Sequence, residues 1–97
     1  MKIFKSDYRY KLHNQGFHHI IQFGWHYRSE TELFSKIIKE LEEMYGPHTE
    51  TVYLDNGYTH RRWNDNWRCE QVRKVKRRRI YLKNEMDATL IMLKVQQ

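Results

Sequence analysis

The chain has 97 residues, 39% hydrophobic and 14% aromatic, with a formal net charge of +6. These values exclude a disordered chain and predict a single domain over 1–97, because the apolar content suffices for one modest core. The lone cysteine, Cys69, excludes an intramolecular disulfide, and no stretch is apolar for the length of a membrane span. We therefore expect a cytoplasmic protein with no membrane partner.

Two stretches near the N-terminus alternate between apolar and polar residues. Residues 7–13 place Tyr8, Tyr10 and Leu12 on one side, and residues 18–27 alternate again after a turn signal at 14–16. A period of two residues is typical of strands, so this region predicts two strands joined by a turn.

The segment 30–45 has the spacing of an amphipathic helix. One apolar stripe runs along it, made of Leu33, Phe34, Ile37, Ile38, Leu41, Met44 and Tyr45. Ser29 and Glu32 have the spacing of a capping box, and Gly46-Pro47 ends the pattern. We predict a helix over about 30–45 that covers one face of a sheet.

The middle of the chain predicts a three-strand meander. Strands are expected over 50–55, over 58–63 and from Trp67 onward, with turns at Asn56-Gly57 and 64–66. Asn-Gly is the strongest signal for a two-residue hairpin turn.

The expected turn lengths determine which residues of this meander face each other. They pair Tyr53 with His60 and Trp63 with Trp67, and they place on the solvent face Tyr53, Tyr58, Arg62 and Arg68. Rings beside cations are found on sheets that hold single-stranded nucleic acid, although ordinary cross-strand packing is an equal alternative. The two indoles could stack on bases, but we favour a cross-strand pair that stabilises the hairpin.

Most of the positive charge lies in one segment. Residues 58–83 contain ten Lys/Arg and two acids, a net charge of +8, and six cations fall within the seven residues 73–79. The run could be a bent strand or an exposed loop, and it could simply be a solvated face. We favour an anion-binding site, because crowded like charges destabilise a fold unless an anion offsets them. The predicted contacts are Arg73, Lys74, Lys76, Arg77, Arg78 and Arg79, extended by Arg62, Arg68, Tyr53 and Tyr58.

The C-terminal residues predict a strand followed by a helix. Residues 79–83 alternate, and Asn84 precedes two acids as a helix N-cap does. Residues 88–95 would suit a hairpin strand as well, and the cap favours a helix. The stretch 80–94, with its Asn84-Glu85-Met86-Asp87-Ala88 box, resembles the closing segment of small tailed-phage accessory proteins, whose final Trp is replaced here by Val95. The resemblance implies a phage accessory or host-takeover protein and transfers no functional residue.

Catalytic and metal-binding motifs are weak in this sequence. It has no H-x-x-x-H or C-x-x-C spacing, no glycine-rich phosphate loop and no nucleophile elbow. His60 and Glu70 could form an acid–base pair, as in a small nuclease, but a simple cross-strand contact is the commoner arrangement. We expect no enzyme, no cofactor and no metal.

These expectations combine into one hypothesis. The fold should be α+β, a four- to five-stranded antiparallel sheet with one main helix and a possible C-terminal helix, as a variant of the ferredoxin-like fold. The function should be non-catalytic nucleic-acid binding. The alternative is an anti-defence or host-takeover inhibitor that docks its cationic surface on an acidic host protein in the host cytoplasm.

Overall fold

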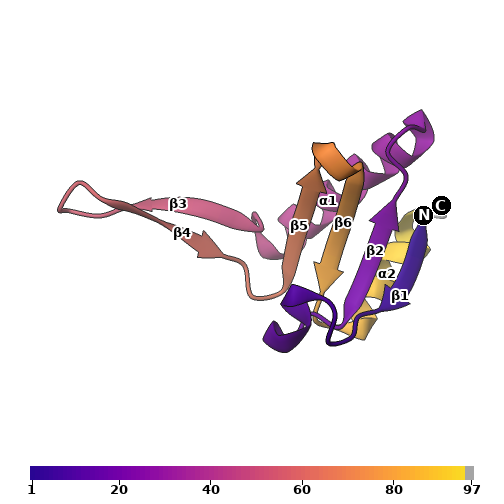
Figure 1. Cartoon of the computed structure of the whole chain (residues 1–97), viewed down its shortest axis with the longest axis horizontal. Helices are drawn as coiled ribbons and strands as arrows, with labels where there is room; N and C mark the ends of the chain where they lie inside the picture. Colours follow the sequence, from indigo (N-terminus) through magenta and orange to yellow (C-terminus); the bar gives the residue numbers. More distant parts are fainter. Residues whose placement is uncertain (96–97) are drawn as a thin grey trace.

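The computed structural model describes residues 1–95. Its main sheet is antiparallel throughout, in the order β1 (Lys2–Lys5), β2 (His19–Phe23), β6 (Arg77–Leu82) and β5 (Trp67–Val72). Helices α1 (Arg28–Tyr45) and α2 (Glu85–Val95) cover one face of this sheet (Figure 1). The predicted α+β class, with its antiparallel sheet, main helix and C-terminal helix, is confirmed. Compared with the β-α-β-β-α-β order of ferredoxin-like folds, two strands precede the first helix and an extra hairpin follows it.

The apolar stripe of α1 forms the centre of the core. It contributes Phe34, Ile37 and Leu41, which pack with Trp67 and with strand and α2 residues Ile21, Phe23, Ile80, Leu82, Ala88 and Ile91. The helix ends as predicted at Gly46, whose φ of 84° suits glycine and whose N–H donates to the Glu42 carbonyl. The predicted capping box does not form, because the helix starts earlier, with Tyr27 as N-cap and no side-chain cap.

Residues 7–13 do not form the predicted strand. Asp7 accepts a hydrogen bond from the Arg9 N–H at 2.9 Å, which closes a turn, and the 3-10 helix η1 (Lys11–Gln15) follows. Tyr8 is 84% exposed, although the alternating pattern placed it on the same side as Tyr10 and Leu12. The strand that precedes β2 and pairs with it is instead β1, which begins at Lys2. Its four residues are too few to show a clear alternation in the sequence.

The predicted three-strand meander is also wrong. Strands β3 (Thr49–Tyr53) and β4 (Thr59–Trp63) form a separate two-stranded sheet, and β5 pairs with β6 instead of β4. This hairpin projects from the body along the 46 Å long axis of the molecule (Figure 1).

The hairpin register is shifted from the predicted one. Tyr53 lies opposite Thr59 and Val52 opposite His60, so the loop spans 54–58 instead of two residues. The Leu54 N–H donates to the Tyr58 carbonyl at 2.8 Å inside this loop. Gly57 keeps the expected positive φ, at 84°, which is why the Asn-Gly turn was located correctly although its length was not.

The C-terminal prediction is confirmed. The Asn84 Oδ1 atom accepts from the Met86 N–H at 2.8 Å, and α2 follows directly. The helix is joined to α1 by a hydrogen bond of 2.6 Å from the Tyr45 hydroxyl to Asp87, a carboxylate with little solvent exposure. Neither helix in the described part of the chain has the length and apolarity needed to cross a bilayer.

His48 joins the base of the hairpin to the main sheet and should make stability depend on pH. Its Nδ1 atom accepts from the Cys69 N–H at 3.2 Å, and its ring lies 5.4 Å from that of Trp67. Burial, with a further contribution from the charge of Arg68, lowers the pKa of His48 below its usual 6.5. The unfolded chain therefore binds a proton more readily than the folded one, so stability is lost as the pH falls through 6.5.

We expect the free energy of unfolding, measured with urea, to be lower at about pH 5.5 than at about pH 7.5. His48→Gln, which keeps a side-chain acceptor that does not titrate, should reduce this difference. His60→Gln, on an exposed strand position of the hairpin, is the matched control and should keep it. An unchanged pH dependence in His48→Gln would contradict the assignment.

Candidate nucleic-acid interface

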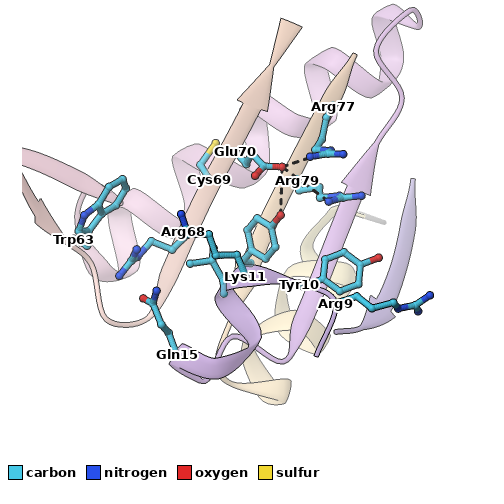
Figure 2. A pocket seen from close by; sticks show the side chains of 12 residues that line it. Arg9, Tyr10, Lys11, Gln15, Trp63, Arg68, Cys69, Glu70, Arg77 and Arg79 are labelled. Carbon is cyan, nitrogen blue, oxygen red and sulfur yellow. Dashed lines mark hydrogen bonds and ion pairs between the residues drawn. The ribbon is translucent and has the colours of Figure 1, made fainter. Parts of the chain in front are cut away.

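The sheet face opposite the helices is only partly covered. At one end, η1 and the segment after it bury a small cluster of Phe17, Ile20 and Tyr81, with Phe4, Tyr10 and Leu12 packed against it. Beside this cluster lies a hollow of about 880 Å³, lined by residues of η1, β4, β5, β6 and the turn before η1 (Figure 2). This volume is within the range of small-ligand sites.

The lining of the hollow is strongly basic. It contains five cations, Arg9, Lys11, Arg68, Arg77 and Arg79, and within the described part of the chain the only acid in this lining is Glu70. Arg9 is already paired with Asp7 at 2.7 Å, outside the lining. The other four cations exceed what the Glu70 carboxylate can neutralise, so the hollow favours an anionic ligand.

Arg68 lies between two rings at one side of the hollow. Its guanidinium carbon is 4.6 Å from the centre of the Trp63 ring and 5.1 Å from that of Phe17, and its Nε donates to the Asn64 carbonyl. Burial lowers the pKa of this guanidinium, which means that the charge has lost part of its hydration. A phosphate approaching from the hollow would replace that hydration.

The other side of the hollow is organised around Glu70. Its Oε1 atom accepts from the Tyr81 hydroxyl at 3.3 Å, and it lies 3.7 Å from Arg77 Nε and 4.0 Å from Arg79 Nη1. Arg79 is further held by the Gln22 side chain at 3.0 Å. Burial raises the pKa of Tyr81, so the phenol keeps its proton and remains a donor to Glu70.

Rings are part of the same lining. Tyr10 has the Arg79 guanidinium 5.2 Å from its ring centre, and Trp63 is 43% exposed. Figure 2 shows both rings lining the hollow, at opposite sides of it. Flat surfaces beside cations can hold unpaired bases by stacking while the cations contact phosphates.

The structure divides the predicted basic run among three places. Arg77 and Arg79 point to the open face, because residues two apart in a strand share a face. Arg73, Lys74 and Lys76 lie in and after the 3-10 turn η2 (Arg73–Val75), which connects the end of β5 to the start of β6, and all three are exposed. The run is thus neither one continuous strand nor one loop.

Arg78 lies on the opposite side of the sheet from Arg77 and Arg79. It is 9% exposed, its guanidinium carbon is 4.3 Å from the centre of the Trp25 ring, and it donates to the Thr31 hydroxyl at 2.6 Å. A buried side chain on the helix face does not reach a ligand on the open face, so Arg78 is separate from the hollow.

Of the four further contacts predicted from the meander, only Arg68, on β5, lines the hollow. Arg62 pairs with Glu50 across the hairpin at 3.1 Å, and Tyr53 and Tyr58 are 81% and 71% exposed beside the distal loop. Sequence reasoning missed Tyr10 and Lys11, since only the packing of η1 on the sheet brings them to β5 and β6. Trp63 was identified, but as a partner of Trp67.

The geometry bears on the one acid–base pair that the sequence suggested and on the single cysteine. His60 lies opposite Val52 in the hairpin, whereas Glu70 lies opposite Arg79 in the main sheet, so the expected cross-strand His60–Glu70 contact is wrong. Burial raises the pKa of the Cys69 thiol to about 11, which keeps it protonated at neutral pH. Among residues 1–95, no three His, Cys, Asp or Glu side chains are grouped closely enough to hold a metal ion.

Known proteins do not indicate a function for this chain, so the geometry of the site is the basis for the proposal below. No family model matches the chain, and neither a curated protein nor a solved structure matches it.

Proposed function

We propose that this protein binds single-stranded nucleic acid, without catalysing a reaction on it, in the hollow on the open face of its main sheet. The observation that supports this most is the convergence of Lys11, Arg68, Arg77 and Arg79 with the rings of Tyr10 and Trp63 in one cavity. Cations alone would fit any polyanion. Cations next to partly exposed rings fit an anion that also carries flat bases.

The shape of the site favours a single strand over a duplex. The rings lie within a hollow about 880 Å³ in volume, large enough for one or two nucleotides. A base in a duplex is stacked on its neighbours and cannot present its flat face to such a ring. The proposed role as a phage accessory protein rests on the C-terminal resemblance alone.

Binding can be measured by fluorescence anisotropy with labelled RNA and DNA strands of about twelve nucleotides, in single-stranded and duplex form. We expect the single strands to bind more tightly than the duplexes. About four phosphate contacts predict a slope near −3 for log affinity against log salt, at about 0.7 per contact.

The alternative, an inhibitor of an acidic host protein, predicts a different result. A single host protein would then be retained in a stoichiometric complex after nuclease treatment. Single strands would show no binding at about 0.15 M salt, which would refute the nucleic-acid proposal.

A further inference from the structure

Glu70 is an unexpected residue in a site for a polyanion. It lies in the middle of β5 and lines the hollow, with a side chain that is 34% exposed. A carboxylate repels phosphate, so its presence weakens general phosphate binding. A ligand group that donates hydrogen bonds to the Glu70 carboxylate would instead be attracted by it.

The contacts of Glu70 leave it able to accept such bonds. Tyr81, Arg77 and Arg79 all approach the same oxygen, Oε1, at 3.3, 3.7 and 4.0 Å. Close charged pairs have separations of about 2.7–2.9 Å, so neither arginine is locked to the carboxylate. Within residues 1–95 the Oε2 atom accepts no hydrogen bond, and Figure 2 shows one Glu70 oxygen making every dashed contact.

The two neighbouring arginines differ in freedom. Arg79 is 16% exposed and is held by Gln22 and by the Tyr10 ring. Arg77 is 41% exposed, and among the described residues its one ion pair is the long contact with Glu70. Within the described residues, the Glu70 carboxylate therefore has one oxygen, Oε2, that accepts no hydrogen bond and another, Oε1, that accepts a single long one. Beside it lies a forked donor, Arg77, that is more exposed and less closely held than Arg79.

This pattern matches one base better than the others. Along its edge, guanine presents two adjacent donors, N2–H and N1–H, followed by two acceptors, O6 and N7. Adenine, cytosine and uracil each place an acceptor next to a single donor group, so a carboxylate facing them meets a lone pair. An adjacent carboxylate and guanidinium fit the guanine order of two donors and two acceptors.

We propose that the hollow prefers guanine in a single strand, with Glu70 accepting from N1–H and N2–H and Arg77 donating to O6 and N7. The ring of Tyr10, next to Arg79, supplies a flat surface near this pair. The inference rests on the proposed function, since it specifies which base the single strand presents to the site.

The test compares an oligouridylate of about nine nucleotides with the same strand carrying one central guanine or one central inosine. A single guanine avoids self-association of the strands. We expect guanine to bind roughly 5- to 150-fold more tightly than uridine, the range for a two-bond base contact, and inosine, which lacks the N2 amine, to fall between them. DNA strands of the same sequences show whether the sugar matters.

The variant Glu70→Gln separates the recognition of guanine from the electrostatic attraction of the hollow for any strand. It should reduce the guanine preference to about twofold or less, because a glutamine amide offers only one acceptor. It should also bind oligouridylate more tightly, because a negative charge leaves the hollow. The control Glu50→Gln removes an equal charge from the hairpin and should keep the preference.

The two proposals fail in different ways. Equal affinity of the unaltered protein for the guanine and uridine strands overturns the guanine preference while leaving single-strand binding intact. A preference that persists in Glu70→Gln overturns the role of Glu70. Absence of binding to all the strands overturns the proposed function itself.

Discussion

Replacing Arg77 and Arg79 together by glutamine should lower the affinity for single-stranded nucleic acid by about 100-fold or more at about 0.1 M salt. A hydrogen bond to a charged group contributes about 1.5–3 kcal/mol, and every 1.4 kcal/mol is a factor of about ten in affinity. On oligouridylate, where Arg77 has no guanine to contact and can face a phosphate, the dependence of log affinity on log salt should also become shallower by about 1.4, since two phosphate contacts are lost. Fluorescence anisotropy at several salt concentrations measures both quantities.

The matched control removes the same charge from the opposite side of the sheet. Lys36 and Lys39 are exposed residues of α1, so Lys36→Gln with Lys39→Gln leaves the hollow unchanged. A third variant, Arg73→Gln with Lys74→Gln, probes the exposed η2 turn and should have an intermediate effect. If all three double variants lost affinity equally, overall charge and not the hollow would be responsible for binding.

The second large effect concerns stability. Trp67→Ala should lower the free energy of unfolding by about 3–5 kcal/mol, a large part of the roughly 5–15 kcal/mol of a typical domain. Trp67 is fully buried between the sheet and the helices, and its indole N–H donates to the Gly46 carbonyl at 3.0 Å. Urea denaturation followed by far-UV circular dichroism measures this loss of stability. The variant Trp67→Phe should still fold and should lose less of the free energy of unfolding than Trp67→Ala.

Trp63 supplies the contrast, because it is 43% exposed at the rim of the hollow. Trp63→Ala should cost about 1 kcal/mol or less in stability but reduce single-strand affinity about tenfold, by removing a stacking surface. The cross-strand indole pair that the sequence predicted is absent, since Trp63 lies opposite Thr49 and Trp67 opposite Leu82. Equal destabilisation by the two alanine variants would contradict these separate environments.

The elements predicted correctly depend on residues that are close together in the chain. The stripe from Leu33 to Tyr45 and the Asn84 cap act over three or four positions, so they could be recognised without knowing the partners. Most errors concern strand pairing, although the strand over 7–13 and the Ser29 capping box were also wrong. Residues 64–66 change the chain direction, with the Asn66 N–H donating to Asn64 Oδ1, but they do not form the expected hairpin loop. The strand after them pairs with β6, which places Trp67 in the core.

In the candidate site, too, the local features could be predicted from the sequence and the pairing of distant segments could not. A local excess of cations in 58–83 was visible in the sequence, whereas the alternation of β6 sends Arg77 and Arg79 to one face and Arg78 to the other. The choice between loop and strand for this run could not be made locally, because no turn residue interrupts it. Tyr10 and Lys11 were missed because they are brought to the site across the sheet.

By itself, the sequence determined the main helix, the concentration of positive charge and the absence of an intramolecular disulfide, and it favoured the C-terminal helix, since these depend on composition and short-range spacing. Only the tertiary structure decided which cations share a face, where the two indoles lie and that a carboxylate sits among arginines. Those features follow from burial and strand pairing between distant segments, where many registers are locally acceptable and the packing of the whole core selects one.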